Sequence, residues 1–280
     1  MDHFTRQGLR FDLTAQGPVG GPAVVALHGF PQTRRSWDLV APMLVARGLR
    51  VLAPDQRGYS PGARPVSRRA YRIGELAADV LAMADQAGIE RFHVVGHDWG
   101  GVVAWELGAR HPERLRSLTV LSMPHPASLL RAFASSTQGL RSWYMAALQV
   151  PRLPERALGA GSGRFARAVL LRSGLPEDRM ETTAALLADR PALAGALAWY
   201  RALPLSVAAM RHVPPVTVPT VYAWGTEDRF LGRAAAEGTA RYVTGPYRLE
   251  ILVGTSHWIL DTVPEVVDRI VADQVMATEP

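Results

Sequence analysis

One carboxylate stands where a sharp turn would expose it. Residues 96–101 read GHDWGG, directly after the apolar run 92–95 (FHVV) and before the helix-like run 102–107 (VVAWEL). A strand, a tight turn flanked by glycines and a helix together place one side chain at the tip of a bend, a layout called a nucleophile elbow. Asp98 occupies the tip, where most such elbows carry Ser. A carboxylate at this position predicts displacement at a carbon atom rather than ester hydrolysis.

Two further polar segments follow strand-like runs later in the chain. Asp228 ends the segment 224–228 (WGTED), and His257 lies in the segment 254–258 (GTSHW). A neutral imidazole can take a proton from water while a buried carboxylate fixes its tautomer and stabilises the cation that forms. Glu227 competes with Asp228 for the acid role. Position within the segment favours Asp228, and the geometry must decide.

The chemistry of an aspartate nucleophile requires two steps. A carboxylate that attacks an sp³ carbon forms an ester, and water can then attack the carbonyl of that ester. Asp98 and His257 therefore predict alkylation of Asp98 followed by hydrolysis of the alkyl-enzyme. The second step creates an oxyanion, which needs fixed hydrogen-bond donors. We expect these to be the backbone N–H groups of Trp99 and of Phe30, the latter in the segment 28–31 (HGFP).

Strand-like and helix-like segments alternate along the chain, which predicts an α/β fold with a mostly parallel sheet. Residues 126–214 interrupt this alternation with helical segments broken by Pro and Gly. We expect a core of residues 1–125 and 215–280, with residues 126–214 inserted as a helical cap over the carboxyl ends of the strands, where open α/β sheets bind ligands. A separate helical domain is disfavoured because both flanking strands belong to the sheet. Strands are predicted at 8–13, 23–27, 50–53, 92–95, 118–121, 219–224 and 248–253, and core helices at 36–47, 73–87 and 264–275.

The HGFP and GHDWGG segments together resemble the epoxide hydrolases of the α/β-hydrolase fold, and the resemblance extends over essentially the whole chain. It implies that fold, with nucleophile, acid and histidine in this order, and hydrolysis of an epoxide to a vicinal diol. In that family two cap tyrosines donate hydrogen bonds to the epoxide oxygen. Segments similar to theirs contain Tyr144 (in 144–151, YMAALQVP) and Tyr200 (in 198–201, AWYR). Ala198 replaces an Asn of the family pattern without touching the proposed donor.

Other readings of these residues stay open or are disfavoured. A haloalkane or haloacid dehalogenase shares the Asp elbow and the His, and Trp99 could hold a halide, but the two tyrosines would then be unexplained. Halide release measured beside diol formation separates these activities. A non-enzymatic binding role is a third class, and failure to form an alkyl-enzyme with any reactive epoxide would support it. Ser60 formally matches a Gly-x-Ser-x-Gly pattern, but Pro61 follows where a helix must begin. His28, His97 and Arg57 are expected to be structural.

The composition limits the classes of molecule that the protein is expected to bind. The net charge is +6, yet all the basic residues are Arg, spread along the chain without a recognisable nucleic-acid motif. The chain has no Cys, and neither a metal-ligand spacing nor a dinucleotide fingerprint is found. Uninterrupted apolar runs fall short of a membrane span, and no signal pattern is seen. We expect a cytoplasmic enzyme without metal or cofactor, acting with water on a largely apolar epoxide. A homodimer is compatible with the sequence, which does not fix the oligomeric state.

Overall fold

The computed structural model describes residues 1–161 and 163–279. Its centre is an eight-stranded sheet with the order β1-β2-β4-β3-β5-β6-β7-β8. Neighbouring strands from β4 to β8 are parallel, whereas β1 and β2 are antiparallel at one edge. The expected mostly parallel sheet is therefore present. Its strands are β1 (His3–Arg6), β2 (Leu9–Gln16), β3 (Ala23–Leu27), β4 (Arg50–Pro54), β5 (Phe92–His97), β6 (Leu115–Leu121), β7 (Thr220–Gly225) and β8 (Tyr247–Leu252).

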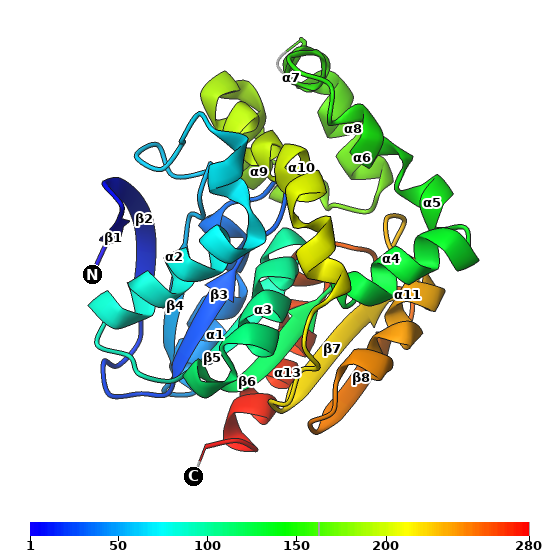
Figure 1. Ribbon diagram of the computed structural model, residues 1–280. Coiled ribbons are helices and arrows are strands. Elements are labelled where there is room, and N and C mark those ends of the chain that lie inside the picture. The colour runs from blue at the N-terminus through cyan, green and yellow to red at the C-terminus, as the bar shows by residue number, and fades with distance from the viewer. Residues whose placement is uncertain (162, 280) are drawn as a thin grey trace.

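Helices cover both faces of this sheet (Figure 1). On one face lie α2 (Ile73–Gln86) and α3 (Trp99–Arg110), and on the other α1 (Val40–Ala46) and α13 (Pro264–Met276). Every residue of β3 is buried because a parallel strand covered on both faces has no solvent side. Shorter core elements are α11 (Arg233–Gly238), α12 (Ile259–Thr262) and the 3₁₀ turns Arg34–Trp37, Arg68–Tyr71, Pro112–Arg114 and Thr239–Tyr242.

Two core elements differ from the sequence expectation. The N-terminal strand is a hairpin, because Gln7 and Gly8 both adopt positive φ and turn β1 back onto β2. The single helix expected at 36–47 is instead a 3₁₀ turn followed by the short α1. Pro42 has no N–H to donate, so it fits the first turn of α1 and would break a helix that continued through it.

Helices also fill the region between β6 and β7. Apart from an isolated bridge at Val216, the described residues there form helices and turns without a strand. Figure 1 shows these helices above the carboxyl ends of the central strands, so their inner side faces the elbow. We call residues 126–214 the cap. Its elements are α4 (Pro126–Ser135), α5 (Gln138–Arg141), α6 (Trp143–Ala147), α7 (Leu153–Gly159), α8 (Arg164–Arg172), the 3₁₀ turn Glu177–Arg179, α9 (Glu181–Ala188) and α10 (Arg190–Arg211).

The 22-residue helix α10 is long and apolar enough to cross a membrane by length and composition, with a mean hydropathy of 1.3. The uninterrupted apolar runs of the sequence do not reveal this helix as a candidate span, because Arg201 divides it. Half of its apolar window is buried inside the protein. Trp199 and Tyr200 at its centre are 1% and 4% exposed. A core helix of a globular fold meets the same criteria, and α10 is packed as one.

Close backbone contact fixes α10 on the core. The indole N–H of Trp199 donates to the carbonyl of Arg57 at 2.7 Å. Beside it, a Cβ added at Gly195 would lie 2.3 Å from the carbonyl oxygen of Gly58, a distance no side chain tolerates. Glycine is therefore required where the helix and the core loop meet, and it sets how α10 presents Tyr200.

Candidate active site

Asp98 lies at the junction between β5 and α3, in a strained conformation with φ 50° and ψ −120°. Two glycines make this bend sterically possible. A Cβ at Gly96 would lie 2.3 Å from the carbonyl oxygen of Gly100, and a Cβ at Gly100 would lie 2.4 Å from that of Leu27. The strand and the helix therefore approach more closely than side chains allow, and the bend projects the Asp98 carboxylate out of the sheet.

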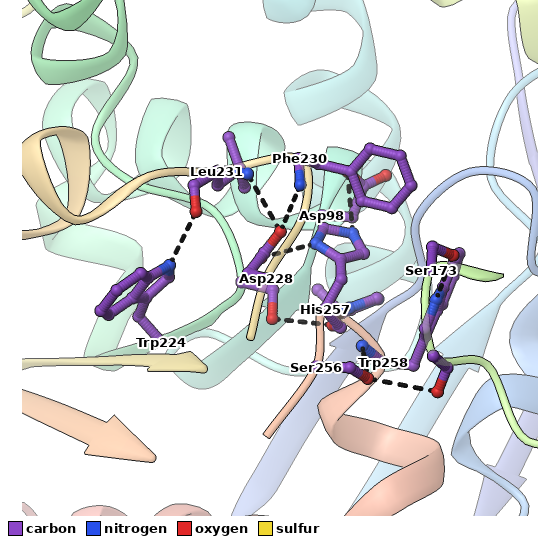
Figure 2. Close-up of polar contacts among 12 residues, drawn as sticks. Asp98, Ser173, Trp224, Asp228, Phe230, Leu231, Ser256, His257 and Trp258 are labelled. Atoms are coloured by element: carbon purple, nitrogen blue, oxygen red, sulfur yellow. Dashed lines mark hydrogen bonds and ion pairs between the residues drawn. The ribbon is translucent and has the colours of Figure 1, made fainter. Parts of the chain in front are cut away.

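His257 lies between two carboxylates (Figure 2). Its Nδ1 is 2.8 Å from Oδ2 of Asp228, and its Nε2 is 3.6 Å from Oδ2 of Asp98. The three side chains come from the ends of three different strands, β5, β7 and β8, which meet at the same edge of the sheet. All three residues are buried. Nδ1 of His257 is directed to Asp228, so Nε2 is the nitrogen available for proton transfer near Asp98.

The acid next to His257 is Asp228, and not its neighbour Glu227, which is exposed. While Oδ2 of Asp228 contacts the imidazole, its Oδ1 accepts the backbone N–H groups of Phe230 and Leu231 at 2.8 and 3.0 Å. These bonds hold the carboxylate in one orientation. The turn after β7 therefore presents a fixed anion to His257.

The main chain of His257 is held as firmly as its ring. Its carbonyl accepts hydrogen bonds from Nε2 of His97 at 2.9 Å and from Oγ of Ser122 at 2.8 Å. His97 therefore has the structural contact expected for it. Sequence reasoning missed Ser122, which follows β6 at a φ of 50°. The only signal for it was a small polar residue just after a strand that ends beside the elbow.

The two carboxylates govern the charge of His257. Burial disfavours the imidazolium, but the negative charges of Asp228 and Asp98 outweigh it and raise the pKa of His257 to about 10. Burial likewise disfavours the charged form of Asp98. Contacts with His257 and with the N–H of Phe30 prevail, and they lower the pKa of Asp98. In the resting site an aspartate anion thus faces an imidazolium.

The two oxygens of Asp98 have different neighbours. Oδ1 accepts the backbone N–H of Phe30 at 2.8 Å, whereas Oδ2 faces His257. Gly29 makes this approach possible, because a Cβ there would lie 2.4 Å from Cβ of Asp98. Among the described contacts, the N–H of Trp99 makes no bond to the resting carboxylate. It is the first residue of α3, where N–H groups have no partner within the helix.

The cap places two phenols opposite Asp98. Tyr144 lies on α6 and Tyr200 on α10, with ring centroids 6.3 Å apart, and both line the same cavity as Asp98. Gln149 joins the two segments, since its side-chain amide donates to the carbonyl of Tyr200 at 2.7 Å. Burial, reinforced by nearby negative charge, raises the pKa of both tyrosines above the usual value. Both hydroxyls therefore stay protonated and able to donate.

A cavity of about 480 Å³ opens beside these groups. It contains Asp98, His257 and both tyrosines, and apolar side chains from the cap and from the loop after β3 form most of its wall. A smaller pocket of about 50 Å³ shares Asp98 and the tyrosines and continues past Trp99. The reactive groups therefore lie between a large and a small apolar space.

The remaining polar residues singled out in the sequence have structural contacts. Ser60 is fully buried, and its hydroxyl donates to the carbonyl of Asp55 and accepts the N–H of Asp12. Arg57 forms a bidentate ion pair with Asp79. Nε2 of His28 accepts the N–H of Gln56 at 3.1 Å. Among the described residues, no group of three or more His, Cys, Asp or Glu side chains is arranged to hold a metal ion.

Comparisons with known proteins agree with this fold. The sequence profile of the alpha/beta hydrolase fold matches residues 22–264. The AB hydrolase superfamily protein YfhM of Bacillus subtilis (strain 168) is 35% identical over 277 residues, covering 95% of this chain and 94% of that protein. Epoxide hydrolase A of Mycobacterium tuberculosis (strain ATCC 25618 / H37Rv) is 31% identical over 291 residues, covering 90% and 89%.

Epoxide hydrolase 4 of Mus musculus is 32% identical over 94% of this chain and 76% of its own length. Among solved structures, epoxide hydrolase A from Mycobacterium thermoresistibile superposes with a TM-score of 0.85 and 28% identity, covering 99% of this chain and 98% of that one. The likeness thus includes the cap as well as the sheet. This chain belongs to the α/β-hydrolase fold family and, within it, to the epoxide hydrolases.

Proposed function

We propose that this protein hydrolyses an epoxide to a vicinal diol through an ester on Asp98. The observation that supports this most directly is one cavity in which Asp98 and His257 face Tyr144 and Tyr200. An aspartate nucleophile needs a leaving group on carbon, and two phenols in the wall of the same cavity suit a leaving group that is an oxygen. The names of the relatives point to the same reaction.

In the first step, Oδ2 of Asp98 attacks an epoxide carbon, and the bond from that carbon to the ring oxygen breaks. Oδ1 is already held by the N–H of Phe30 at 2.8 Å, whereas Oδ2 makes only the longer contact of 3.6 Å with Nε2 of His257, so Oδ2 is the oxygen available for attack. The alkoxide that leaves takes a proton from Tyr144 or Tyr200, and solvent replaces this proton. The raised pKa of the tyrosines keeps the proton available until the alkoxide develops.

The second step begins with a change of charge. Ester formation removes the negative charge of Asp98, which is one of the causes that raise the pKa of His257. His257 then releases its proton to solvent more easily, and the neutral ring can act as a base. Alkylation of Asp98 therefore prepares the base that the next step needs.

Hydrolysis follows from the same geometry. His257 takes a proton from water, and the resulting hydroxide attacks the carbonyl carbon of the ester. The oxyanion forms on Oδ1, where the N–H of Phe30 is in place and the N–H of Trp99 joins it. Collapse expels the diol oxygen, which takes the proton from His257, and the carboxyl group of Asp98 ionises again. Asp228 orients the neutral ring and stabilises the imidazolium that forms when His257 takes the proton from water.

A single turnover in water labelled with ¹⁸O tests this mechanism. With enzyme in excess, the first diol formed should contain unlabelled oxygen from Asp98, and the label should enter Asp98 instead. Label in every diol of the first turnover would overturn the covalent path. The alternative of a haloalkane or haloacid dehalogenase is tested in parallel: halide release without diol formation from matched substrates would favour it.

The substrate class is part of this proposal. The predominantly apolar wall of the large cavity favours an epoxide with apolar substituents. We also expect the protein to be located in the cytoplasm. A homodimer is compatible with the sequence. Cell fractionation and light scattering at several protein concentrations test them.

A further inference from the structure

The formal charge of the chain is concentrated in the cap. Residues 126–214 contain eleven of the 31 arginines and only five of the 25 acidic residues, so their net charge equals the +6 of the whole chain. The rest of the chain is balanced, with twenty residues of each sign. Within the cap, residues 140–172 contain six arginines and one acidic residue, Glu155. Arginines occur throughout the sequence, but they outnumber the acidic residues only in the cap.

The same segment exposes large apolar side chains. Twelve large hydrophobic side chains are exposed in the described part of the chain, and half of them fall within residues 140–169. Trp143 is 70% exposed, Leu153 61% and Phe165 60%. Charged or polar residues normally occupy such positions, and an exposed group of this kind marks a surface that contacts something other than water.

These side chains surround the opening of the active-site cavity. Trp143, Leu153, Phe165 and Val169 are exposed and also line the 480 Å³ cavity, so they form its rim. Arg141, also exposed, lines the same cavity. The helices that carry these residues, α5 to α8, lie along one side of the molecule (Figure 1). We call this surface, with Leu140 and the arginines of residues 140–172, the mouth face.

The arginines of the mouth face are largely uncompensated. Glu155 is paired with Arg201 of α10. Arg167 pairs with Glu177. Among the described residues, Arg156 and Arg164 form no ion pair with a carboxylate, and both are exposed. The surface therefore combines apolar side chains that avoid water with cations that lack counter-ions.

We propose that the mouth face binds the surface of an anionic lipid bilayer. Tryptophan, phenylalanine and leucine enter the boundary between headgroups and acyl chains, while arginines contact the lipid phosphates. A second copy of the chain is a poorer occupant, because two such faces would bring like charges together. Binding in this orientation points the cavity at the bilayer, so that an apolar substrate dissolved in lipid enters without crossing water. The surface proposal stands whether or not the substrate is an epoxide.

Tryptophan fluorescence gives a readout confined to the mouth face. Of the seven tryptophans, Trp143 is exposed, and the other six are at most 7% exposed. Vesicles of phosphatidylcholine and phosphatidylglycerol in equal parts should shift the emission to shorter wavelength as Trp143 leaves water. The shift should be absent with phosphatidylcholine alone and in the variant Trp143→Phe. No shift with the anionic vesicles would overturn the proposal.

A matched pair of charge variants tests the electrostatic part. Arg164→Glu reverses a charge on the mouth face, at the first residue of α8, where a glutamate suits the helix N-terminus. Arg269→Glu reverses an exposed charge on α13, outside the cap. In flotation with the full-length protein, Arg164→Glu should weaken binding to the anionic vesicles more than about five-fold, since one arginine near such a surface contributes about 1 kcal/mol. Arg269→Glu should bind as the parent protein does.

The apolar part has its own variant. Leu140 is 76% exposed and lies outside the cavity wall, so Leu140→Ser tests insertion without altering the cavity. Leu140→Ser should weaken vesicle binding. Without vesicles, both Leu140→Ser and Arg164→Glu should turn over a water-soluble substrate as the parent protein does. Equal vesicle binding by Arg164→Glu and Arg269→Glu would contradict the proposal. A blue shift that grows with protein concentration without lipid, together with dimers in sedimentation, would reassign the face to self-association.

Discussion

Asp98 and His257 meet at one oxygen only: Oδ2 of the carboxylate lies 3.6 Å from Nε2 of the imidazole, while Oδ1 accepts the N–H of Phe30. This division separates two tasks within one side chain. One oxygen is available to attack carbon, and the other already occupies the place where negative charge develops later. The two residues are also coupled electrostatically, because the negative charge of Asp98 raises the pKa of His257.

Asp98→Asn should lower the pKa of His257 from about 10, because it removes one of the negative charges that hold the proton on the ring. Turnover should fall by several orders of magnitude, since the nucleophile is lost. NMR titration of the His257 ring measures the pKa directly. Asp228→Asn serves as comparison and should lower it further, because Asp228 makes the larger contribution. An unchanged pKa in both variants would contradict the charge coupling.

His257→Gln should trap the ester. Alkylation needs only Asp98 and the tyrosines, while hydrolysis needs a base, so the alkyl-enzyme should accumulate with each added epoxide. Mass spectrometry of the intact protein should reveal a gain equal to the mass of one substrate. Peptide mapping should locate the gain at Asp98. A modified residue elsewhere, or steady diol formation by this variant, would contradict the assignment.

Tyr144→Phe and Tyr200→Phe should slow alkylation and leave ester hydrolysis unchanged. Each removes one donor to the alkoxide, and general acid assistance of this kind contributes about 10²–10⁴-fold when lost entirely. The double variant should therefore lose more than either single variant. Rapid-quench kinetics separates the two steps. Tyr71→Phe is a control, because Tyr71 is a buried tyrosine outside the cavity wall.

The stability of the fold should fall as the pH rises from about 6.5 toward 10. His257 binds its proton more tightly in the folded chain than in the unfolded one, because its pKa is raised from 6.5 to about 10. This contribution is present in full below pH 6.5 and is lost as the pH passes through the folded value. Urea denaturation at several pH values measures the trend. The slope over this range should be smaller in His257→Gln.

Gly195→Ala should destabilise the contact between cap and core. The added methyl group would lie 2.3 Å from the carbonyl oxygen of Gly58, so α10 must move, at a cost of about 1–3 kcal/mol. Thermal unfolding measures the loss, and kcat should fall because α10 carries Tyr200. Gly74→Ala is the matched control: its Cβ meets only Glu106 at 4.0 Å, and alanine favours a helix. Equal melting temperatures for the two variants would contradict this prediction.

Sequence alone predicted the elements whose signals are local. Continuous apolar runs identify the buried strands, and the glycines around Asp98 identify the elbow, because sterics leave few other uses for that pattern. The resemblance to the epoxide hydrolases supplied the two tyrosines. The structure places both in one cavity with Asp98 and His257.

What the sequence did not reveal depends on contacts between distant segments. Ser122 supports the carbonyl of His257, which lies 135 positions away along the chain. The positive charge of the mouth face becomes a surface property only when α5 to α8 are folded together. Such features arise from packing and leave little trace in local spacing.

The tyrosine pair stands between spaces of about 480 and 50 Å³. This difference in volume separates the two substituents of the oxirane ring by size. A bulky group fits only on the side of the mouth, and a hydrogen or a small alkyl group fits on the other. An unsymmetrical substrate therefore has one binding orientation, which presents a single ring carbon to Asp98. The diol leaving this site should be one regioisomer in its ¹⁸O labelling and predominantly one enantiomer.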